Sequence, residues 1–497
     1  MPSHPIPKRG ISSVFLVAAS VLFLVAAGVL YACSEDARGH GPGSDRAGAP
    51  WAADEEFDIE AAVARPKEGA APNVVFIVVD TLRAQSVGCY GQQRPTTPNI
   101  DRFAETATRF PHSIATASWT LPTHATYFTG RHSLEHGVRH HPIKPDERNY
   151  KSKIPEDLDT LAETFRMMDY TTGARTANTY LGHRFGFHRG FQDYIIERKY
   201  GEAVTQDAID WIDAHQEKPF FLFLNYMDAH RPYNLEPQPD LFPNGIDTNE
   251  KLHTKLYNAV MDGKGPIPEE LARKVHRQYL NGVRNADEHI GVLLDWLRQH
   301  DLFENSLIVI TSDHGESFGE HHFANHGNCL YQEQIWVPLL IKAAGQQGSK
   351  VEDALVTSVD IPRLILQGLP KVLAAPHEKK YPYLPGNHPA LAELYYVRAI
   401  DLYHKDRKHR FNRIVRTIFD GHHKFFETSD DTNELYNLNK DPGEQNNLIN
   451  SDTATMREEM KRAREWAEPR FRKVDVPGKA LELDQEQEDE LKALGYL

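Results

Sequence analysis

Apolar residues gather into three short uninterrupted runs along the chain, each bounded by polar sequence. Together with the residues that end them, these runs span 73–80, 220–224 and 307–312. Runs of this length that are rich in β-branched and aromatic side chains are typical of strands buried on both faces of a parallel sheet. Apolar positions at helical spacing lie between them, at 98–108, 156–167, 202–215 and 267–299. Strands that alternate with helices predict an α/β sheet covered by helices on both faces.

The pattern changes on either side of this region. Residues 34–70 are rich in Gly, Ala, Asp, Glu and Pro, which predicts a flexible linker. Beyond residue 370, short mixed runs between 393 and 428 predict a small antiparallel sheet, and the charged end of the chain predicts a helix. We therefore divide the chain into a linker at 34–70, a main α/β domain at 71–370, a small-sheet subdomain at 371–450 and a helical tail at 451–497.

Residues 1–33 have the pattern of an export signal. Lys8 and Arg9 precede an apolar run from Ile11 to Ala32, and Cys33 follows it. A basic start, an apolar centre and a small residue before the cut are typical of such signals. The ending Leu-Tyr-Ala-Cys is similar to a bacterial lipobox, in which Cys33 would be acylated. An uncleaved transmembrane anchor is the alternative, because the run is about 20 residues long. Both interpretations place the protein at the cell envelope of a bacterium, periplasmic or outer-surface and tethered to a membrane, and the lipoprotein is favoured.

Composition narrows the classes of partner. The 497 residues carry 56 Lys and Arg against 70 Asp and Glu, a net charge of −14, and no long basic cluster. A protein that binds a phosphate backbone normally presents a basic face, so a nucleic-acid partner is not expected. The three cysteines are too few for a disulfide scaffold. A Cys89–Cys329 bridge and free thiols are both compatible with the sequence.

Acidic residues end two of the predicted strands. Asp80 closes the first, and Asp313 directly follows the third. Ligands of open α/β sheets bind at the carboxyl ends of strands, so we expect both carboxylates in one site. His314 adds an imidazole, and Gly315 lets the backbone turn away. Such oxygen and nitrogen donors suit a divalent cation.

Thr120 is the candidate nucleophile, in the sequence Ser118-Trp119-Thr120-Leu121-Pro122-Thr123-His124. A hydroxyl that attacks phosphorus or sulfur needs activation, and coordination to a divalent cation lowers its pKa. The structural alternative is a helix N-cap, because Ser or Thr shortly before Pro often begins a helix. The two roles are compatible, since the N–H groups at a helix start also face an anion.

Several further short motifs follow one another in a fixed order. They are Thr97-Pro98-Asn99-Ile100-Asp101, Thr129-Gly130-Arg131, His136-Gly137-Val138, Ser312-Asp313-His314-Gly315, Val337-Pro338-Leu339 and Glu434-Leu435-Tyr436-Asn437-Leu438. With the motif at Thr120, this set resembles the sulfatase family of the alkaline phosphatase superfamily, over about residues 73–345 and again around 420–448. The resemblance implies a large mixed, mainly parallel sheet with helices on both faces and a small C-terminal α+β subdomain.

The departures from the family pattern bear on the chemistry. Cys-type sulfatases carry C-x-P-S-R where this chain reads T-L-P-T-H, and a Thr cannot become formylglycine, so that modification is not expected. Thr81 stands where the family usually has a second Asp, and the family's G-K-W-H-L-G block is replaced around Asn178. The chain is therefore similar to the Thr-nucleophile branch of the superfamily, which includes phosphodiesterases and phosphoethanolamine or phosphoglycerol transferases. The branch implies one divalent metal ion (Zn, Mn, Ca or Mg), held by Asp80, Thr120, Asp313 and His314.

The resemblance also implies residues that contact the substrate. His230 and His326 would act in catalysis, by donating to an ester oxygen or by protonating the leaving oxygen. A structural histidine is the alternative for each. Candidates for substrate binding are His124, Asn178, Tyr180 and Arg131.

Two further pairs have weaker signals. Arg83 and Arg131 are alternatively salt-bridged supports. Asp228 and His321 would complete a second metal site if the protein used two metals.

The favoured hypothesis is a metal-dependent hydrolase that cleaves phosphate or sulfate esters through a metal-bound Thr120, with phosphodiesters or other phosphoesters preferred. The alternatives are a sulfuric ester hydrolase by lineage, an envelope phosphoethanolamine- or phosphoglycerol-type transferase, and a non-catalytic binding protein. The substrate would be a small-molecule, lipid or glycan ester, and the N-terminus would hold the enzyme on a membrane.

Overall fold

The computed structural model describes residues 57–66, 71–140, 152–197, 200–262, 266–396, 413–451 and 454–472, all within one unit of the chain, Ala49–Leu497. The predicted export signal, most of the predicted linker and residues 473–497 of the predicted tail lie outside these ranges. Among the described helices, none has both the length and the apolar character needed to cross a membrane.

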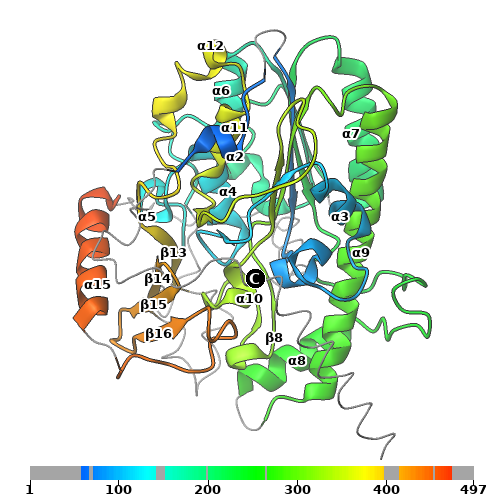
Figure 1. Ribbon diagram of the computed structural model, residues 1–497. Helices are drawn as coiled ribbons and strands as arrows, with labels where there is room; N and C mark the ends of the chain where they lie inside the picture. Colours follow the sequence, from blue (N-terminus) through cyan, green and yellow to red (C-terminus); the bar gives the residue numbers. More distant parts are fainter. Residues whose placement is uncertain are drawn as a thin grey trace, which may run out of the picture. The chain divides into compact units, whose positions relative to one another are not determined.

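An eight-stranded sheet organises the described part of the chain (Figure 1), in the order β11-β2-β10-β7-β1-β6-β4-β5. Its strands are β1 (Asn73–Val79), β2 (Thr108–Arg109), β4 (Thr171–Thr176), β5 (Asp193–Ile196), β6 (Phe220–Tyr226), β7 (Ser306–Thr311), β10 (Leu339–Lys342) and β11 (Lys350–Val351). The five strands from β7 to β5 are parallel, and β10 runs antiparallel to both of its neighbours. The sheet is therefore mixed and mainly parallel, which confirms the predicted fold class.

The three apolar runs form the centre of this sheet. Strands β1, β6 and β7 are buried along their whole length. Ile77 of β1 pairs with Leu224 on one side and with Ile310 on the other. A strand between two partners, with helices above and below, has no solvent-facing side, so the sequence is apolar at every position rather than at alternate ones.

Helices cover both faces of the sheet (Figure 1). On one face lie α3 (Pro98–Ala104), α7 (Gly201–His215) and α9 (Glu269–Gln299), and on the other lie α4 (Thr120–Thr129), α6 (Leu161–Met167) and α11 (Ile361–Gln367). The remaining short elements are α2 (Ile59–Ala62), β3 (Ser113–Ile114), α5 (Ser133–His136), α8 (Lys251–Asp262), β8 (Ser317–Phe318), β9 (Ala324–Asn325), α10 (Gln332–Ile335), β12 (Val356–Thr357) and α12 (Lys371–Ala374). Each predicted helix has a counterpart, although α3 and α6 are shorter than their apolar patterns.

A second, four-stranded antiparallel sheet follows in the chain. It consists of β13 (Ala390–Tyr395), β14 (Ile414–Asp420), β15 (His423–Thr428) and β16 (Glu434–Asn437), and helix α15 (Ala454–Ala467) packs against it. A buried ion pair of 2.7 Å, Lys424 Nζ to Glu444 Oε1, fixes the loop after β16. Glu444 Oε2 also accepts a hydrogen bond from the backbone N–H of Gln332 in the main domain (2.7 Å). The small sheet is thus attached to the segment that leads into α10.

Candidate metal and nucleophile site

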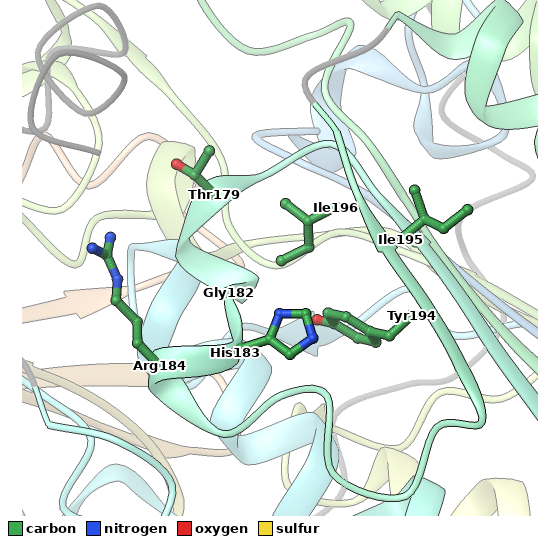
Figure 2. Close-up of a pocket in the computed structure, with 7 residues that line it drawn as sticks. All are labelled: Thr179, Gly182, His183, Arg184, Tyr194, Ile195 and Ile196. Atoms are coloured by element: carbon green, nitrogen blue, oxygen red, sulfur yellow. The ribbon is translucent and has the colours of Figure 1, made fainter. Parts of the chain in front are cut away.

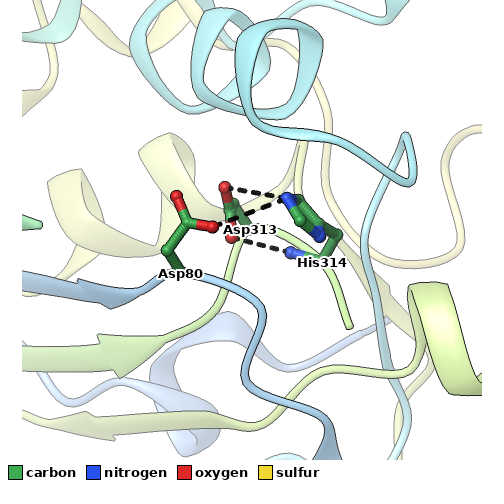
Figure 3. A group of neighbouring side chains, drawn as sticks. All are labelled: Asp80, Asp313 and His314. Carbon is green, nitrogen blue, oxygen red and sulfur yellow. Dashed lines mark hydrogen bonds and ion pairs between the residues drawn. The ribbon is translucent and has the colours of Figure 1, made fainter. Parts of the chain in front are cut away.

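The carboxyl ends of β1 and β7 bring three ligand-type side chains together (Figure 3). Val78 of β1 pairs with Thr311 of β7, so the residues two positions further on, Asp80 and Asp313, emerge at the same edge of the sheet. One ligand atom from each of Asp80, Asp313 and His314 lies within 4.8 Å of the others, and all three side chains are buried. His314 Nε2 is 3.4 Å from Asp313 Oδ2 and 3.8 Å from Asp80 Oδ1. The predicted grouping of these three residues is present.

Backbone contacts fix the orientation of these ligands. Asp313 Oδ1 accepts hydrogen bonds from the N–H groups of His314 (3.0 Å) and Thr81 (3.3 Å). His314 Nδ1 lies 2.9 Å from the carbonyl oxygen of Gly315, which can only accept, so this nitrogen carries the proton. The unprotonated Nε2 is therefore the nitrogen that faces the two carboxylates, as a metal-binding histidine requires.

The unsatisfied atoms of the cluster fit a divalent cation. Asp80 Oδ1 and Asp313 Oδ2 are buried and have no hydrogen-bond partner among the described residues. Burial, followed by repulsion from Asp313, raises the pKa of Asp80 well above its usual value, and burial raises the pKa of Asp313 to about 7. Two adjacent buried carboxylates are costly unless a cation compensates them, and oxygen and imidazole donors are the set that a divalent metal prefers.

Thr120 lies at the edge of this cluster. It is the first residue of α4, and the residue before it, Trp119, is extended and occupies the N-cap position. The alternative in which Thr120 is the N-cap is therefore wrong by one residue. Thr120 Oγ1 lies 3.4 Å from His314 Nε2 and 3.3 Å from Asn178 Nδ2. The hydroxyl is thus placed both beside the candidate ligands and at a helix start, where backbone N–H groups favour an anion.

Asn178 and His124 complete the immediate surroundings of Thr120. Asn178 Nδ2 donates to Asp80 Oδ2 (2.7 Å), and its Oδ1 accepts from the N–H of Tyr180 (2.9 Å). His124 Nδ1 donates to the carbonyl of Thr120 (2.9 Å) and lies 3.5 Å from Asp313 Oδ2. Burial lowers the pKa of His124 to about 3, so this ring is neutral where an arginine would be charged.

Aromatic rings pack around Trp119, the residue before Thr120. Trp119 stacks on His140 with 3.9 Å between ring centroids and meets Tyr180 edge-on at 6.1 Å. Tyr180, a predicted substrate contact, is nearly fully buried. Its position next to Trp119 places it along the wall beside Thr120.

The two candidate catalytic histidines lie against the metal cluster. The ring centroid of His326 is 4.4 Å from that of His314 and 5.2 Å from that of His230. Burial lowers the pKa of His230 well below its usual value. His326 Nδ1 contacts the carboxylate of Glu316, and Tyr233 donates to the same carboxylate. Neither partner was assigned a role from the sequence, although Glu316 directly follows the Ser312-Asp313-His314-Gly315 motif.

The structure does not bring the second candidate metal site together. Asp228 Oδ1 accepts hydrogen bonds from the N–H of Gly201 (2.9 Å) and from Asn285 (2.5 Å). His321 instead lies 2.9 Å from Glu333. The only metal-compatible group of His, Cys, Asp and Glu in the described ranges is the one at Asp80, so the two-metal alternative is wrong for this part of the chain.

The remaining candidates have structural contacts. Arg131 donates to the backbone carbonyl of Lys380 (2.8 Å), and Arg83 forms a 2.9 Å salt bridge with Glu320. Arg83 thus matches the interpretation as a support. Cys89 and Cys329 are both free thiols, so the bridge between them is not formed.

A cavity of about 490 Å³ lies at the segment that follows Asn178 (Figure 2). Its lining comes from the turn after Asn178 and from the carboxyl end of β5, and consists of Thr179, Gly182, His183, Arg184, Tyr194, Ile195 and Ile196. Figure 2 shows the rings of His183 and Tyr194 next to each other, and they meet edge-on with 5.5 Å between their centroids. Thr179 directly follows Asn178, so one wall of the cavity continues the chain that contacts Thr120.

Comparisons with known proteins agree with this arrangement. A family model described as Sulfatase matches residues 72–370. An ulvan-active sulfatase of Formosa agariphila is 24% identical over 341 residues, which cover 61% of this chain and 63% of that protein. The multifunctional alkaline phosphatase superfamily protein PehA of Trinickia caryophylli is 22% identical over 379 residues, 60% of this chain and 73% of that protein. The chain thus spans less than two thirds of the length of the ulvan-active relative.

Among solved structures, the phosphonate monoester hydrolase of Agrobacterium radiobacter superimposes with a TM-score of 0.60 at 16% identity, over 80% of this chain and 95% of that one. At this identity the superposition shows a shared fold. Because the family model covers more than half of the residues, the chain belongs to the sulfatase family of the alkaline phosphatase superfamily.

Proposed function

We propose that the chain is a metal-dependent hydrolase of phosphate esters, with phosphodiesters preferred, in which Thr120 is the nucleophile. The observation that carries this proposal is the position of Thr120 Oγ1, 3.4 Å from His314 Nε2 at the start of α4 and beside two unsatisfied carboxylate oxygens. The hydroxyl must act as itself, because a threonine cannot become formylglycine.

The residues around Thr120 have separate roles in the proposed reaction. A divalent cation held by Asp80, Asp313 and His314 would supply charge stabilisation and lower the pKa of the Thr120 hydroxyl. The Thr120 hydroxyl releases its proton to solvent as the Thr120 Oγ1–phosphorus bond forms and the bond from phosphorus to the alcohol breaks, and a histidine protonates the departing oxygen. Asn178 holds the hydroxyl in place through the 3.3 Å contact of its Nδ2. Water then cleaves the Thr120–phosphorus bond and returns a proton to Thr120.

A histidine other than His124 must supply the proton. The pKa of His124 is lowered to about 3 by burial, so it carries no proton to give on Nε2 near neutral pH. The ring centroid of His326 lies 4.4 Å from that of His314, and the ring centroid of His230 lies 5.2 Å from that of His326. We propose His326 as the donor to the leaving oxygen. The pKa of His230 is also lowered well below its usual value by burial, and its Nδ1 lies 2.7 Å from the carbonyl oxygen of Arg231, so His230 lines the site with an unprotonated Nε2.

The residues that line the cavity indicate which kind of alcohol the substrate ester contains. The lining combines His183 and Arg184 with Tyr194 and two isoleucines, a mixture of basic, aromatic and apolar groups. Such a lining favours a sugar or another polar alcohol over a lipid chain, because sugars stack on aromatic rings while their hydroxyl groups need polar partners. We propose that the alcohol of the ester extends toward this cavity.

Sulfate esters are the second candidate, since the matching family model is described as Sulfatase and an ulvan-active sulfatase is among the relatives. A matched set of four substrates separates the two: a phosphodiester, a phosphomonoester, a phosphonate monoester and a sulfate of the same phenol. We expect the highest kcat/KM for one of the phosphorus esters, in a sample whose bound metal is measured in parallel. A sulfate that is cleaved fastest would overturn the phosphate assignment.

We also propose that Cys33 is acylated and tethers the enzyme to a bacterial membrane. The support is the apolar run that ends in Leu-Tyr-Ala-Cys. Growth of expressing cells with a labelled fatty acid tests this, with Cys33→Ala as the control. We expect label on the wild-type protein and none on Cys33→Ala. A wild-type protein without label would contradict the tether.

A further inference from the structure

Glu316 and His326 are held opposite each other by a small hairpin. Strands β8 and β9 pair antiparallel, with Ser317 opposite Asn325 and Phe318 opposite Ala324. The next pair outward in this register is Glu316 with His326. The antiparallel register therefore sets the two side chains across from each other, as cross-strand neighbours.

The hairpin is fixed from outside by a buried amide. Gln334 Nε2 lies 2.8 Å from Ser317 Oγ and 2.9 Å from the carbonyl oxygen of Asn325, one atom on each strand. On either side of His326, Asn325 and Gly327 adopt left-handed backbone conformations, with φ of 67° and 75°. These bends turn the His326 ring inward toward the metal cluster instead of letting the strand continue.

The contact between Glu316 and His326 defines the state of the imidazole. His326 Nδ1 is 3.1 Å and 3.3 Å from the two oxygens of Glu316, and both side chains are buried. Tyr233 donates its hydroxyl proton to Glu316 Oε2 (2.8 Å), so that oxygen acts as an acceptor. A carboxylate can only accept, which places a proton on His326 Nδ1 and leaves Nε2 as the nitrogen that this ring can present to a substrate.

We infer that Glu316 is a positioning residue for the reaction: it orients His326 as the proton donor to the leaving oxygen, and Tyr233 in turn fixes Glu316. This inference deepens the proposed function and rests on it. As the bond from phosphorus to the alcohol breaks, the Nε2 proton of a doubly protonated His326 moves to the leaving oxygen, and the ring stays protonated on Nδ1. The water that later cleaves the Thr120 ester returns a proton to Nε2. A carboxylate behind the ring holds it in one orientation and one tautomer, as an aspartate does behind the histidine of a serine hydrolase.

Glu316→Gln tests this role with little change in shape. Without the carboxylate charge, esters with poor leaving groups should lose the most, because only they need a proton as the bond breaks. We expect kcat/KM for an alkyl or unsubstituted phenyl ester to fall about 10- to 100-fold, the usual effect of removing a carboxylate behind a functional histidine. The loss for a nitrophenyl ester should be several-fold smaller. Tyr233→Phe should give the same pattern more weakly.

Asp360→Asn is the matched control. Asp360 forms a buried 2.8 Å pair with His388, outside the site, so its loss removes a carboxylate–histidine contact without touching the reaction. It should leave the ratio between the two leaving groups unchanged. An equal loss on both esters in Glu316→Gln, or no loss on either, would overturn the inference, provided that metal content and melting temperature match the wild type.

A second readout separates this inference from the proposed function. Nitrogen NMR of ¹⁵N-histidine-labelled protein, with His326→Gln to assign the signal, reports which ring nitrogen carries the proton. A protonated Nδ1 in the wild type and a changed signal in Glu316→Gln would support the contact between Glu316 and His326. This result does not depend on whether the preferred ester is a phosphate or a sulfate. If it is a sulfate, the leaving-group series is run on sulfate esters. A wild-type ring protonated only on Nε2 would overturn the inference whatever the substrate.

Discussion

One threonine beside the candidate metal ligands has a strained backbone conformation. Thr81, directly after Asp80, has a φ of 63°, a conformation that a β-branched residue rarely adopts and that costs on the order of 1–3 kcal/mol. Its hydroxyl donates to the carbonyl of Asp80 (2.6 Å), and its own carbonyl accepts from Tyr279 (3.0 Å). These contacts offset the strain and turn the backbone so that Thr81 N–H points at Asp313. The bend after β1 is thus part of what orients the ligands.

His136, in the His-Gly-Val motif, should make the protein sensitive to acid. Its Nδ1 accepts the N–H of Val138 (2.9 Å), and burial lowers its pKa to about 3. The unfolded chain has a histidine pKa of about 6.5, so below that pH the unfolded state binds a proton that the folded state does not. The free energy of unfolding should therefore fall as pH falls from about 6.5 to about 4, by up to about 1.4 kcal/mol per pH unit for this residue. His136→Asn, whose Oδ1 can replace Nδ1 as acceptor, should reduce that slope.

Urea unfolding at several pH values measures both slopes. His300→Asn, at an exposed position, serves as the control and should keep the wild-type slope. Equal slopes for wild type and His136→Asn would contradict the assignment of the acid sensitivity to this ring.

At the scale of residues, the sequence predicted the ligands better than their supports. Asp80, Asp313, His314 and Thr120 lie together as expected, because each follows an apolar strand or begins a helix that the pattern reveals. The role of Glu316 could not be seen, since it depends on strands of two residues and on backbone bends that leave no hydrophobic period. Asp228 does not form the predicted pair of metal ligands, because His321, its expected partner, lies 2.9 Å from Glu333 instead.

At the scale of elements, the long helix α9 packs closely against the segment after β6. The spacing of apolar residues along the helix does not predict this contact. A Cβ atom on Gly282 would lie 2.2 Å from the carbonyl oxygen of Asp228, at the end of the β6 segment. Helix propensity alone predicts that Gly282→Ala stabilises the helix by about 1 kcal/mol. The clash of the new Cβ atom with a rigid backbone atom should outweigh the gain in helix propensity. We therefore expect Gly282→Ala to lower the free energy of unfolding by about 1–3 kcal/mol.

Val292→Ala on the same helix is the matched control, because Val292 is 51% exposed. It should change the free energy of unfolding by less than about 0.5 kcal/mol. Both are measured by denaturant unfolding, and a Gly282→Ala protein at least as stable as the wild type would show that the helix can move away from β6.

The elements that the sequence did predict share one property, which is length. Strands β1, β6 and β7 are long enough for their uninterrupted apolar runs to be recognised. Helices α7 and α9 are long enough for their helical spacing of apolar residues to be recognised. The edge strand β11 and its neighbour β2 have two residues each, and β11 is exposed. Their pairing depends on neighbours far along the chain, so the mixed character of the sheet followed from the family resemblance and not from the pattern.

At the scale of the whole molecule, a buried ion pair within the small-sheet subdomain holds Glu444, whose Oε2 accepts a hydrogen bond from the Gln332 N–H of the main domain. Lys424→Met would leave the Glu444 carboxylate buried without its cation, which typically costs about 3–5 kcal/mol. Thermal unfolding should show a large loss for Lys424→Met and partial recovery when Glu444→Gln is added. Lys461→Met, from an exposed pair with Glu465, should have almost no effect. A Lys424→Met protein with wild-type stability would mean that water or a shifted side chain reaches Glu444.

Metal removal should also act on the whole fold. A ligand that binds only the folded state adds about 2.7 kcal/mol at 100 times its dissociation constant. Dialysis against a chelator should therefore lower the melting temperature, and a divalent cation should restore it. Asp313→Asn should lose most of this response while exposed Asp301→Asn keeps it. A melting temperature that is indifferent to chelator and cation would contradict the metal site.

The most direct test of the central claim compares Thr120→Ala and Thr120→Ser on an aryl phosphodiester, with bound metal measured in each sample. If Thr120 is the nucleophile, Thr120→Ala should lower kcat/KM by about a thousandfold or more, the scale seen when a nucleophile is removed. Thr120→Ser keeps a hydroxyl and should retain measurable turnover. A Thr120→Ala enzyme that holds the metal and stays within about threefold of the wild type would contradict the account.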